Sequence, residues 1–255
     1  MRALRRTLLP LAGALCLLAL MSGPALAQAQ NQGDVNVDFG DLGNGDAPQQ
    51  SVIIILAMTL LSVAPSLLVM LTSFTRIIIV LSITRNALGL PSIPPNQVMV
   101  GLAMFLSLFI MSPTLKAMNE RALQPLLKNQ ISPSAAFEAG QAPLKAFMLK
   151  QTRKEELEVF IKASGSARPK NINNVSMATL APAFILSELR AAFIIGFIVF
   201  IPFLIIDILI SSTLMSMGLM MLPPVLISLP FKLLLFVMVD GWGLIARSLV
   251  ASFRQ

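Results

Sequence analysis

The residues most suited to a specialised role form a methionine-rich stretch in the C-terminal part of the sequence. Four methionines fall within seven residues: Met215, Met217, Met220 and Met221. Methionine side chains are long, unbranched and polarizable, so a cluster of them forms a soft surface that can repack. Pro223-Pro224 follows the cluster and indicates the tip of a helical hairpin. The pattern favours a deformable plug in a channel, and the alternative is ordinary packing within an apolar helix.

A second set of candidate residues consists of ionisable side chains within apolar runs: Glu188, Arg190, Asp207, Lys232 and Asp240. A charge inside a membrane segment is costly and by default faces a partner or a water-filled path. Glu188 and Arg190 are separated by about 200° around a helix, so at least one must face another helix or subunit. Lys232 has no acidic residue within a turn or two, and its candidate partners are Glu188 and Asp207. These charges are either ion pairs that fix helix packing or parts of a conduction path.

Patterns typical of enzymes are missing from the sequence. It contains no histidine, and its single cysteine, Cys16, lies in the N-terminal apolar run. This composition excludes the usual zinc sites, haem ligation by His or Cys, and Cys–His or Ser–His nucleophile pairs. There is also no glycine-rich phosphate loop, no pair of carboxylates at catalytic spacing and no metal motif. We therefore expect a protein that is not an enzyme, with no cofactor and no metal.

The composition is that of a membrane protein. Hydrophobic residues make up 56% of the chain, charged residues make up 12%, and the mean hydropathy is +0.80. A chain of this composition is too apolar to be an ordinary soluble domain. Four apolar runs are expected to form helices, and they are Val52–Leu71 (continuing to Ile83), Val98–Met111, Phe184–Ile210 and Val225–Val250.

The N-terminal residues 1–27 have the pattern of a cleaved secretory signal. Three arginines precede the apolar run Leu8–Leu20, and Ala25 and Ala27 supply small residues before the expected cut after Ala27. The alternative is a first transmembrane anchor. Residues 28–51 are polar and glycine-rich and carry four aspartates and no basic residue. Such a composition predicts a flexible acidic tail on the exported side.

The remaining sequence predicts an all-α fold of two kinked helical hairpins that flank a helical insert. The first hairpin covers residues 52–112, the insert 113–175, and the second hairpin, with its methionine-rich loop, 176–255. Pro202 and Pro230 are expected to kink the helices of the second hairpin because proline removes a backbone donor and clashes with the preceding turn.

The insert has the composition of a small soluble domain, with ten basic and five acidic residues. Pro113 is typical of a helix start. Thr152 and Glu155 predict a capping box that opens a helix over Arg153–Ala163. The charged residues that begin at Arg153 are either a solvated face or a contact with a neighbouring subunit.

Several long motifs are specific enough to identify a family. They are Phe184–Arg190, Phe200–Asp207, Leu229–Lys232, Val239–Trp242, Leu71–Arg76 and Asn86–Gly89. These motifs closely resemble those of the FliP family of flagellar type III export-gate proteins. The resemblance runs from about Ile53 to the C-terminus, and a related family serves virulence type III secretion. The cleavable signal is more typical of the flagellar branch.

The resemblance implies a subunit of a protein-export channel that is required for flagellum biogenesis. In this family several copies assemble with FliQ and FliR into a hetero-oligomeric, helical channel at the bacterial inner membrane, with FlhA and FlhB nearby. The channel passes unfolded flagellar proteins, and it binds no nucleic acid. The resemblance also implies a place in the flagellar basal body, with the insert in the periplasm.

The resemblance assigns roles to some of the candidate residues as well. The methionine gate of the family corresponds to the four methionines of the cluster, and its charge contacts suggest roles for Glu188 and Lys232. An alternative function is a secondary transporter or ion channel in which Asp207, Lys232 and Asp240 form a relay. An intramembrane enzyme is disfavoured because histidine and a catalytic dyad are missing.

Overall fold

The computed structural model describes residues 58–59, 62, 66, 69–164, 172–219 and 222–253. Contacts within the chain divide it into two units, residues 1–59 and 60–255, and almost all described residues belong to the second. Several predictions lie outside the described residues: the signal peptide with its cleavage site at Ala27, the acidic tail, and the gate residues Met220 and Met221.

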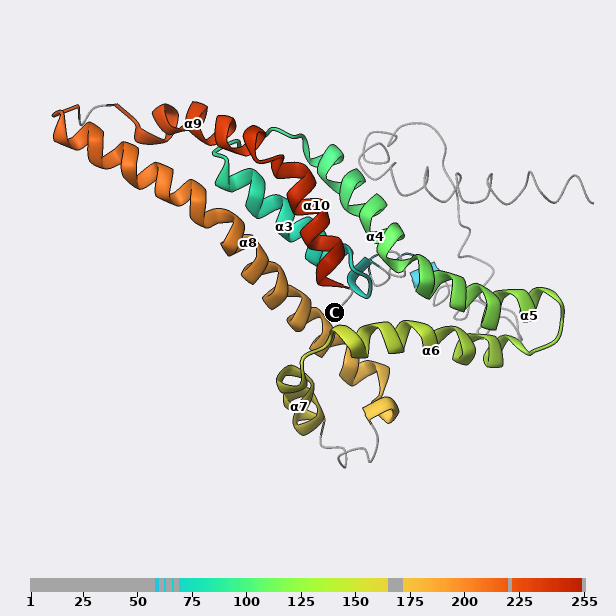
Figure 1. The fold of residues 1–255 in the computed structure, drawn as a ribbon. Coiled ribbons are helices and arrows are strands. Elements are labelled where there is room, and N and C mark those ends of the chain that lie inside the picture. The colour runs from blue at the N-terminus through green and yellow to red at the C-terminus, as the bar shows by residue number, and fades with distance from the viewer. Residues whose placement is uncertain are drawn as a thin grey trace, which may run out of the picture. The chain divides into compact units, whose positions relative to one another are not determined.

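Every regular element in the described part of the chain is a helix, which confirms the all-α prediction. In chain order they are α3 (Phe74–Ala87), α4 (Asn96–Met118), the π-helical η3 (Asn119–Leu123), α5 (Gln124–Leu127), α6 (Pro133–Gln151), α7 (Lys154–Ala163), the 3₁₀ turn η4 (Ile172–Asn174), α8 (Met177–Ser216), α9 (Pro224–Met238) and α10 (Gly241–Ser252) (Figure 1). Helices α6 and α8 begin at serines, Ser132 and Ser176, whose hydroxyls accept a backbone N–H three residues later. Such caps satisfy one of the donors that a helix start leaves unpaired.

Two helical stretches of the described residues are long and apolar enough to cross a membrane. Asn96–Leu127 has 32 residues and a mean hydropathy of 2.0, and Met177–Ser216 has 40 residues and a mean hydropathy of 3.0. Helices α9 and α10 together pass the same test and would make a third span, although they are bent by 60° at their break.

The helix start expected at Pro113 is wrong, whereas the kinks expected at Pro202 and Pro230 stay predictions. Pro113 does not start a helix, because α4 continues through it into η3 and α5. Helix α8 is likewise unbroken at Pro202, and α9 is unbroken at Pro230. The bend between α9 and α10 falls at Asp240, whose φ of 51° is left-handed.

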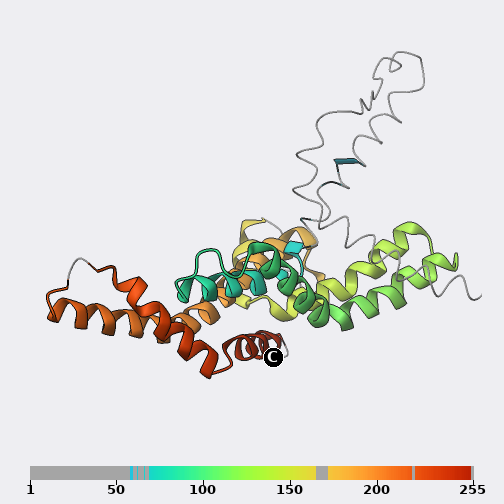
Figure 2. The ribbon, with the colours of Figure 1, turned by 90° about the horizontal axis from the view of Figure 1, so that it is seen from above.

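Helix α3 lies at the centre of the larger hydrophobic core and packs against α4 and α8 (Figures 1 and 2). Ile77, Val80 and Leu81 of α3 are fully buried or nearly so. Gly196 of α8 packs against the side chain of Ile83 of α3, and a Cβ added at Gly196 would lie 2.5 Å from Cδ1 of Ile83. A larger residue at this position would therefore force Ile83 to move.

A second core joins the insert to the beginning of α8. Its buried residues include Met148 of α6, Leu157 of α7, and Leu180 and Phe184 of α8. In both views the turn between α5 and α6 and the turn between α8 and α9 lie at opposite ends of this unit (Figures 1 and 2). The chain end after α10 lies between them, beside the junction of α6 with α8 (Figure 1).

The close contact at Gly196 predicts the effect of a larger side chain. Gly196→Val should lower the free energy of unfolding by about 1–3 kcal/mol, because Ile83 would have to move out of a packed interface. The measurement is chemical unfolding of the purified protein in detergent. Gly101→Val is the matched control, since nothing lies within 4 Å of a Cβ added at Gly101 of α4. Equal stability of the two variants would contradict the prediction.

Candidate functional site

Helix α8 carries three ionisable residues, and each pairs with a side chain from a different element. Glu188 pairs with Arg76 of α3, Arg190 with Glu156 of α7, and Asp207 with Lys232 of α9. Glu188 and Arg190 face different helices, as their spacing on α8 requires. The charges of this long apolar helix thus fix which helix packs against each part of it.

The pair of Arg76 with Glu188 is the most deeply buried of the three. The Arg76 Nε donates to Glu188 Oε2 at 2.9 Å, and the Nη2 donates to Oε1. Glu188 is fully buried and Arg76 is 4% exposed. A bidentate guanidinium–carboxylate pair has the geometry that holds two charges away from water.

The sequence reasoning did not include Arg76 among the candidates. The signal was nevertheless present, because Arg76 is a single charge inside the apolar stretch that extends to Ile83. Its partner could not be read from spacing, since the two residues are 112 positions apart.

Lys232 pairs with Asp207, one of its two candidate partners, whereas the other, Glu188, is occupied by Arg76. The Lys232 Nζ donates to Asp207 Oδ2 at 2.6 Å and to the carbonyl oxygen of Ala87 at 3.2 Å. Ala87 is the last residue of α3, so the lysine satisfies one of the carbonyls that a helix end leaves unpaired. The hydroxyl of Ser228 donates to the other oxygen of Asp207 at 2.6 Å. This cluster joins the end of α3 to both helices of the second hairpin.

The pair of Arg190 with Glu156 attaches α7 to α8. The Arg190 Nη1 donates to Glu156 Oε1 at 3.0 Å, and the Arg190 side chain is half exposed while Glu156 is buried. Burial tends to raise the pKa of Glu156, but a backbone hydrogen bond, the nearby Arg190 and the charge of Arg153 together hold that pKa below its ordinary value of 4.5. Glu156 is therefore an anion that depends on these donors and charges.

The capping box predicted at the start of α7 is wrong. The hydroxyl of Thr152 donates back to the carbonyl of Met148 in α6, and no side chain caps α7. Thr152 belongs to the end of α6, where this local hydrogen bond competes with a cap. Arg153 occupies the cap position instead, and its backbone N–H donates to the hydroxyl of Ser187 on α8 at 3.1 Å.

Asp240 is exposed rather than buried. It lies at the bend between α9 and α10 and accepts a hydrogen bond from Arg247 at 3.0 Å, and both side chains are more than two thirds exposed. Gly241 follows it, and a Cβ there would lie 2.2 Å from the ring of Phe236. The sharp bend therefore needs this glycine, and the aspartate is a surface residue of the bend.

The described methionines of the cluster lie at the tip of the second hairpin. Met215 is in the last turn of α8, and Met217 follows the end of the helix; their exposed fractions are 62% and 67%. Gly218 has a φ of 76°, which reverses the chain. Pro224 then begins α9, a position where its missing N–H costs nothing. The tip presents flexible apolar side chains and no described charge.

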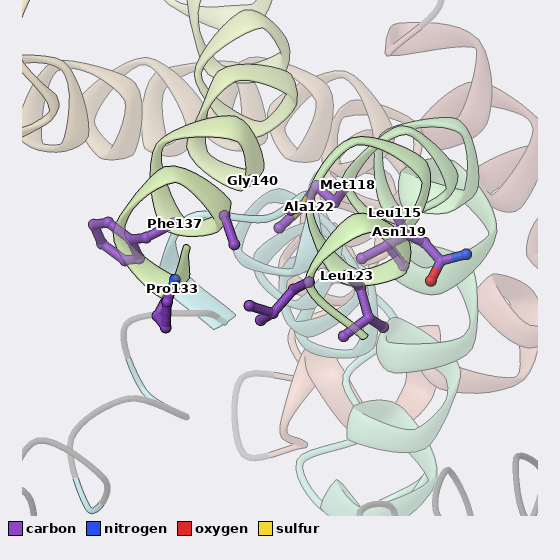
Figure 3. A pocket seen from close by; sticks show the side chains of 10 residues that line it. Leu115, Met118, Asn119, Ala122, Leu123, Pro133, Phe137 and Gly140 are labelled. Atoms are coloured by element: carbon purple, nitrogen blue, oxygen red, sulfur yellow. The ribbon is translucent and has the colours of Figure 1, made fainter. Parts of the chain in front are cut away.

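An apolar groove lies in the insert between η3 and α6 (Figure 3). Its volume is about 490 Å³ and its polar lining residue is Asn119. The side chain of Phe137 is 69% exposed, and Gly140 faces Ala122 across the narrow end. The described residues contain no group of three His, Cys, Asp or Glu that could hold a metal ion. The groove suits packing against another apolar surface.

Comparisons with known proteins agree on one family. The model of the FliP family matches residues 57–249. The chain is 52% identical over 203 residues to the flagellar biosynthetic protein FliP of Bacillus subtilis, which covers 80% of this chain and 92% of that protein. It is 46% identical over 233 residues to the protein of the same name from Caulobacter vibrioides, which covers 91% and 86%.

The cluster at Lys232 predicts unequal effects of removing its two charges. Asp207→Leu should lower the free energy of unfolding by about 3 kcal/mol or more, because it leaves a buried ammonium with only a carbonyl partner. Lys232→Met should cost less, about 1–2 kcal/mol, because Asp207 keeps the Ser228 donor and is 27% exposed. Chemical unfolding of the purified protein measures both. Arg247→Ala, at the exposed pair, is the control and should change stability by about 1 kcal/mol or less. The reverse order of the two variants would contradict the assignment.

The pair at Glu156 predicts a dependence on pH. Because the pKa of Glu156 is lowered in the folded protein, its contribution to stability is complete above the ordinary value of 4.5 and is lost as the pH falls through the folded pKa. The α7 segment should therefore become easier to digest as the pH falls below 4.5. Hydrogen exchange or limited proteolysis of residues 154–163 across a pH series measures this. In Glu156→Gln the same series should show a smaller change, and an identical profile would disprove the role of this carboxylate.

Proposed function

The chain belongs to the FliP family, and we propose on that premise that it is a subunit of the gate through which unfolded flagellar proteins are exported. In this proposal, copies of the chain assemble with FliQ and FliR at the inner membrane, within the flagellar basal body and near FlhA and FlhB. The insert lies on the periplasmic side. The protein acts as a structural component and not as an enzyme.

The observation that carries the proposal is the exposed tip between α8 and α9. Met215 and Met217 extend into solvent at the end of a long helix, beyond the cluster of Asp207 with Lys232. A ring of such tips from several subunits would make an apolar constriction. Methionine suits this position because its flexible side chain can repack around a passing chain and then close again.

Unpartnered apolar surface on α8 supports an assembly. Many large side chains on this helix are exposed in a single chain, among them Phe193, Phe197, Ile198, Ile208 and Leu209. Such a surface needs either lipid or another protein against it. The channel assembly supplies protein partners on these faces.

The alternative function, a transporter or ion channel in which Asp207, Lys232 and Asp240 form a relay, has less support than the export gate. Asp207 and Lys232 are hydrogen-bonded to each other, and their remaining bonds go to Ser228 and the Ala87 carbonyl. Asp240, the third member of the proposed relay, is paired with Arg247 at an exposed bend. No continuous row of titratable groups connects these sites among the described residues.

A test of the gate replaces Met215, Met217, Met220 and Met221 together with alanine. The assembled complex should then conduct small ions in a planar bilayer while the wild-type complex stays closed, because alanine removes the side chains that fill the constriction. The number of subunits that copurify shows whether the variant still assembles. Met238→Ala is the control, since Met238 is 77% exposed but lies on α9 away from the tip. An assembled complex with unchanged conductance would disprove the gate.

A further inference from the structure

The last described residues of the chain are bound by Arg76, near the beginning of the described part. Ser252 lies 176 positions after Arg76, and its carbonyl oxygen and hydroxyl both accept from the Arg76 Nη1, at 3.2 Å and 3.0 Å. The Arg76 Cζ lies 3.8 Å from the ring centroid of Phe253. We propose that Ser252 and Phe253 form a C-terminal strap, and that its docking on Arg76 completes the fold and closes the buried ion pair.

The hydrogen bonds of Arg76 show why the strap matters. A guanidinium has five N–H donors and no acceptor. Two of the bonds go to Glu188, one goes to the side-chain oxygen of Gln151, and two go to Ser252. The strap therefore receives two of the five bonds and also covers one face of the guanidinium. Without it, a charge in a site that is 5% exposed loses these partners.

The strap is also held from the side of the insert. The Nε2 of Gln151, at the end of α6, donates to the carbonyl of Phe253 at 3.3 Å. The ring of Phe253 is 7% exposed and stacks on Phe147 of α6, with centroids 6.3 Å apart and planes at 19°. Phe147 in turn contacts the ring of Phe184 on α8, at 6.0 Å and 61°. The strap thus lies where α3, α6 and α8 meet.

Ser252 and Phe253 come after all of their partners in the buried site along the chain. Arg76 and Glu188 belong to helices that precede the strap, so without Ser252 and Phe253 the guanidinium of the buried pair lacks two of its hydrogen bonds and its aromatic cover. The carbonyl of Ser252 is one of the unpaired carbonyls at the end of α10, where a cation is favourable. In a variant truncated before Ser252, water reaches the ion pair and the contact of α3 with α8 is weakened. The strap therefore makes the packing of α3 against α8 depend on Ser252 and Phe253, independently of the export function proposed above.

The test compares two truncations of the full chain in two backgrounds. One chain ends after Phe253 and is the control, and the other ends after Ala251 and lacks the strap. The second background carries Arg76→Met with Glu188→Met, which replaces the ion pair by apolar side chains of similar size. Each chain is extracted from purified membranes with detergent and heated. The fraction that stays soluble is taken as the folded fraction.

In the unaltered background, loss of the strap should reduce the folded fraction by about tenfold or more, because bonds to a charged group and a cation–π contact are lost. In the apolar background the packing of Phe253 is lost as well, but the same truncation should reduce the folded fraction by a factor about five times smaller or less, since no charge is left to be covered. Equal reductions in both backgrounds would overturn the proposal and leave only general packing by Phe253.

A second measurement decides the matter if the apolar background does not fold. Hydrogen exchange of residues 74–81 in α3 should be faster in the chain ending after Ala251 than in the chain ending after Phe253. Phe253→Leu, which keeps an apolar side chain but removes the ring, should increase exchange more than Ser252→Ala, which leaves the carbonyl acceptor in place. Unchanged exchange in the truncated chain would refute the strap.

Discussion

Two buried cations connect the helices of this protein, and each performs the same two tasks. Arg76 binds Glu188 of α8 and the carbonyl at the end of α10, and Lys232 binds Asp207 of α8 and the carbonyl at the end of α3. A helix end leaves carbonyls unpaired and carries partial negative charge, so a cation that faces both a carboxylate and a helix end is doubly compensated. The cost of burying these charges is thereby offset, and the same contacts determine which helices meet.

The position of α3 follows from these two contacts. The guanidinium near its first turn faces Glu188, and its last carbonyl accepts from Lys232, so both ends of the helix are attached to the second hairpin. Between them Gly196 lets the backbones of α3 and α8 approach closely. The part of α8 beyond Asp207 has no comparable attachment to α3 among the described contacts. That part of α8 instead packs against α9, and the methionine tip lies where these two helices meet, away from α3.

Patterns along the sequence were enough to predict the helices, the apolar runs and the turn at Pro223-Pro224, because these depend on neighbouring residues. They also showed that Glu188 and Arg190 must face different partners. Sequence patterns could not predict which charged residues pair. Arg76 and Glu188 are 112 positions apart, and only the packing of α3 on α8 brings them together. The helix start at Pro113 and the cap at Thr152 failed for a related reason. Both are local signals: α4 continues through Pro113, and at Thr152 a competing hydrogen bond to the end of α6 outweighed the cap.

Helix α8 has charged side chains that contact helices of the same chain and apolar faces that stay exposed. Charged side chains face helices of the same chain and are compensated there, so they leave little free charge with which to attract a partner. The faces that remain are rows of Phe, Ile and Leu, which contribute area but little directional preference. In the assembly proposed above, recognition between subunits would then come from shape, and the shape of this surface is set by where the buried cations hold α3 and α9 against α8. A substitution at Arg76 or Lys232 would therefore alter the outer apolar surface although neither residue lies on it.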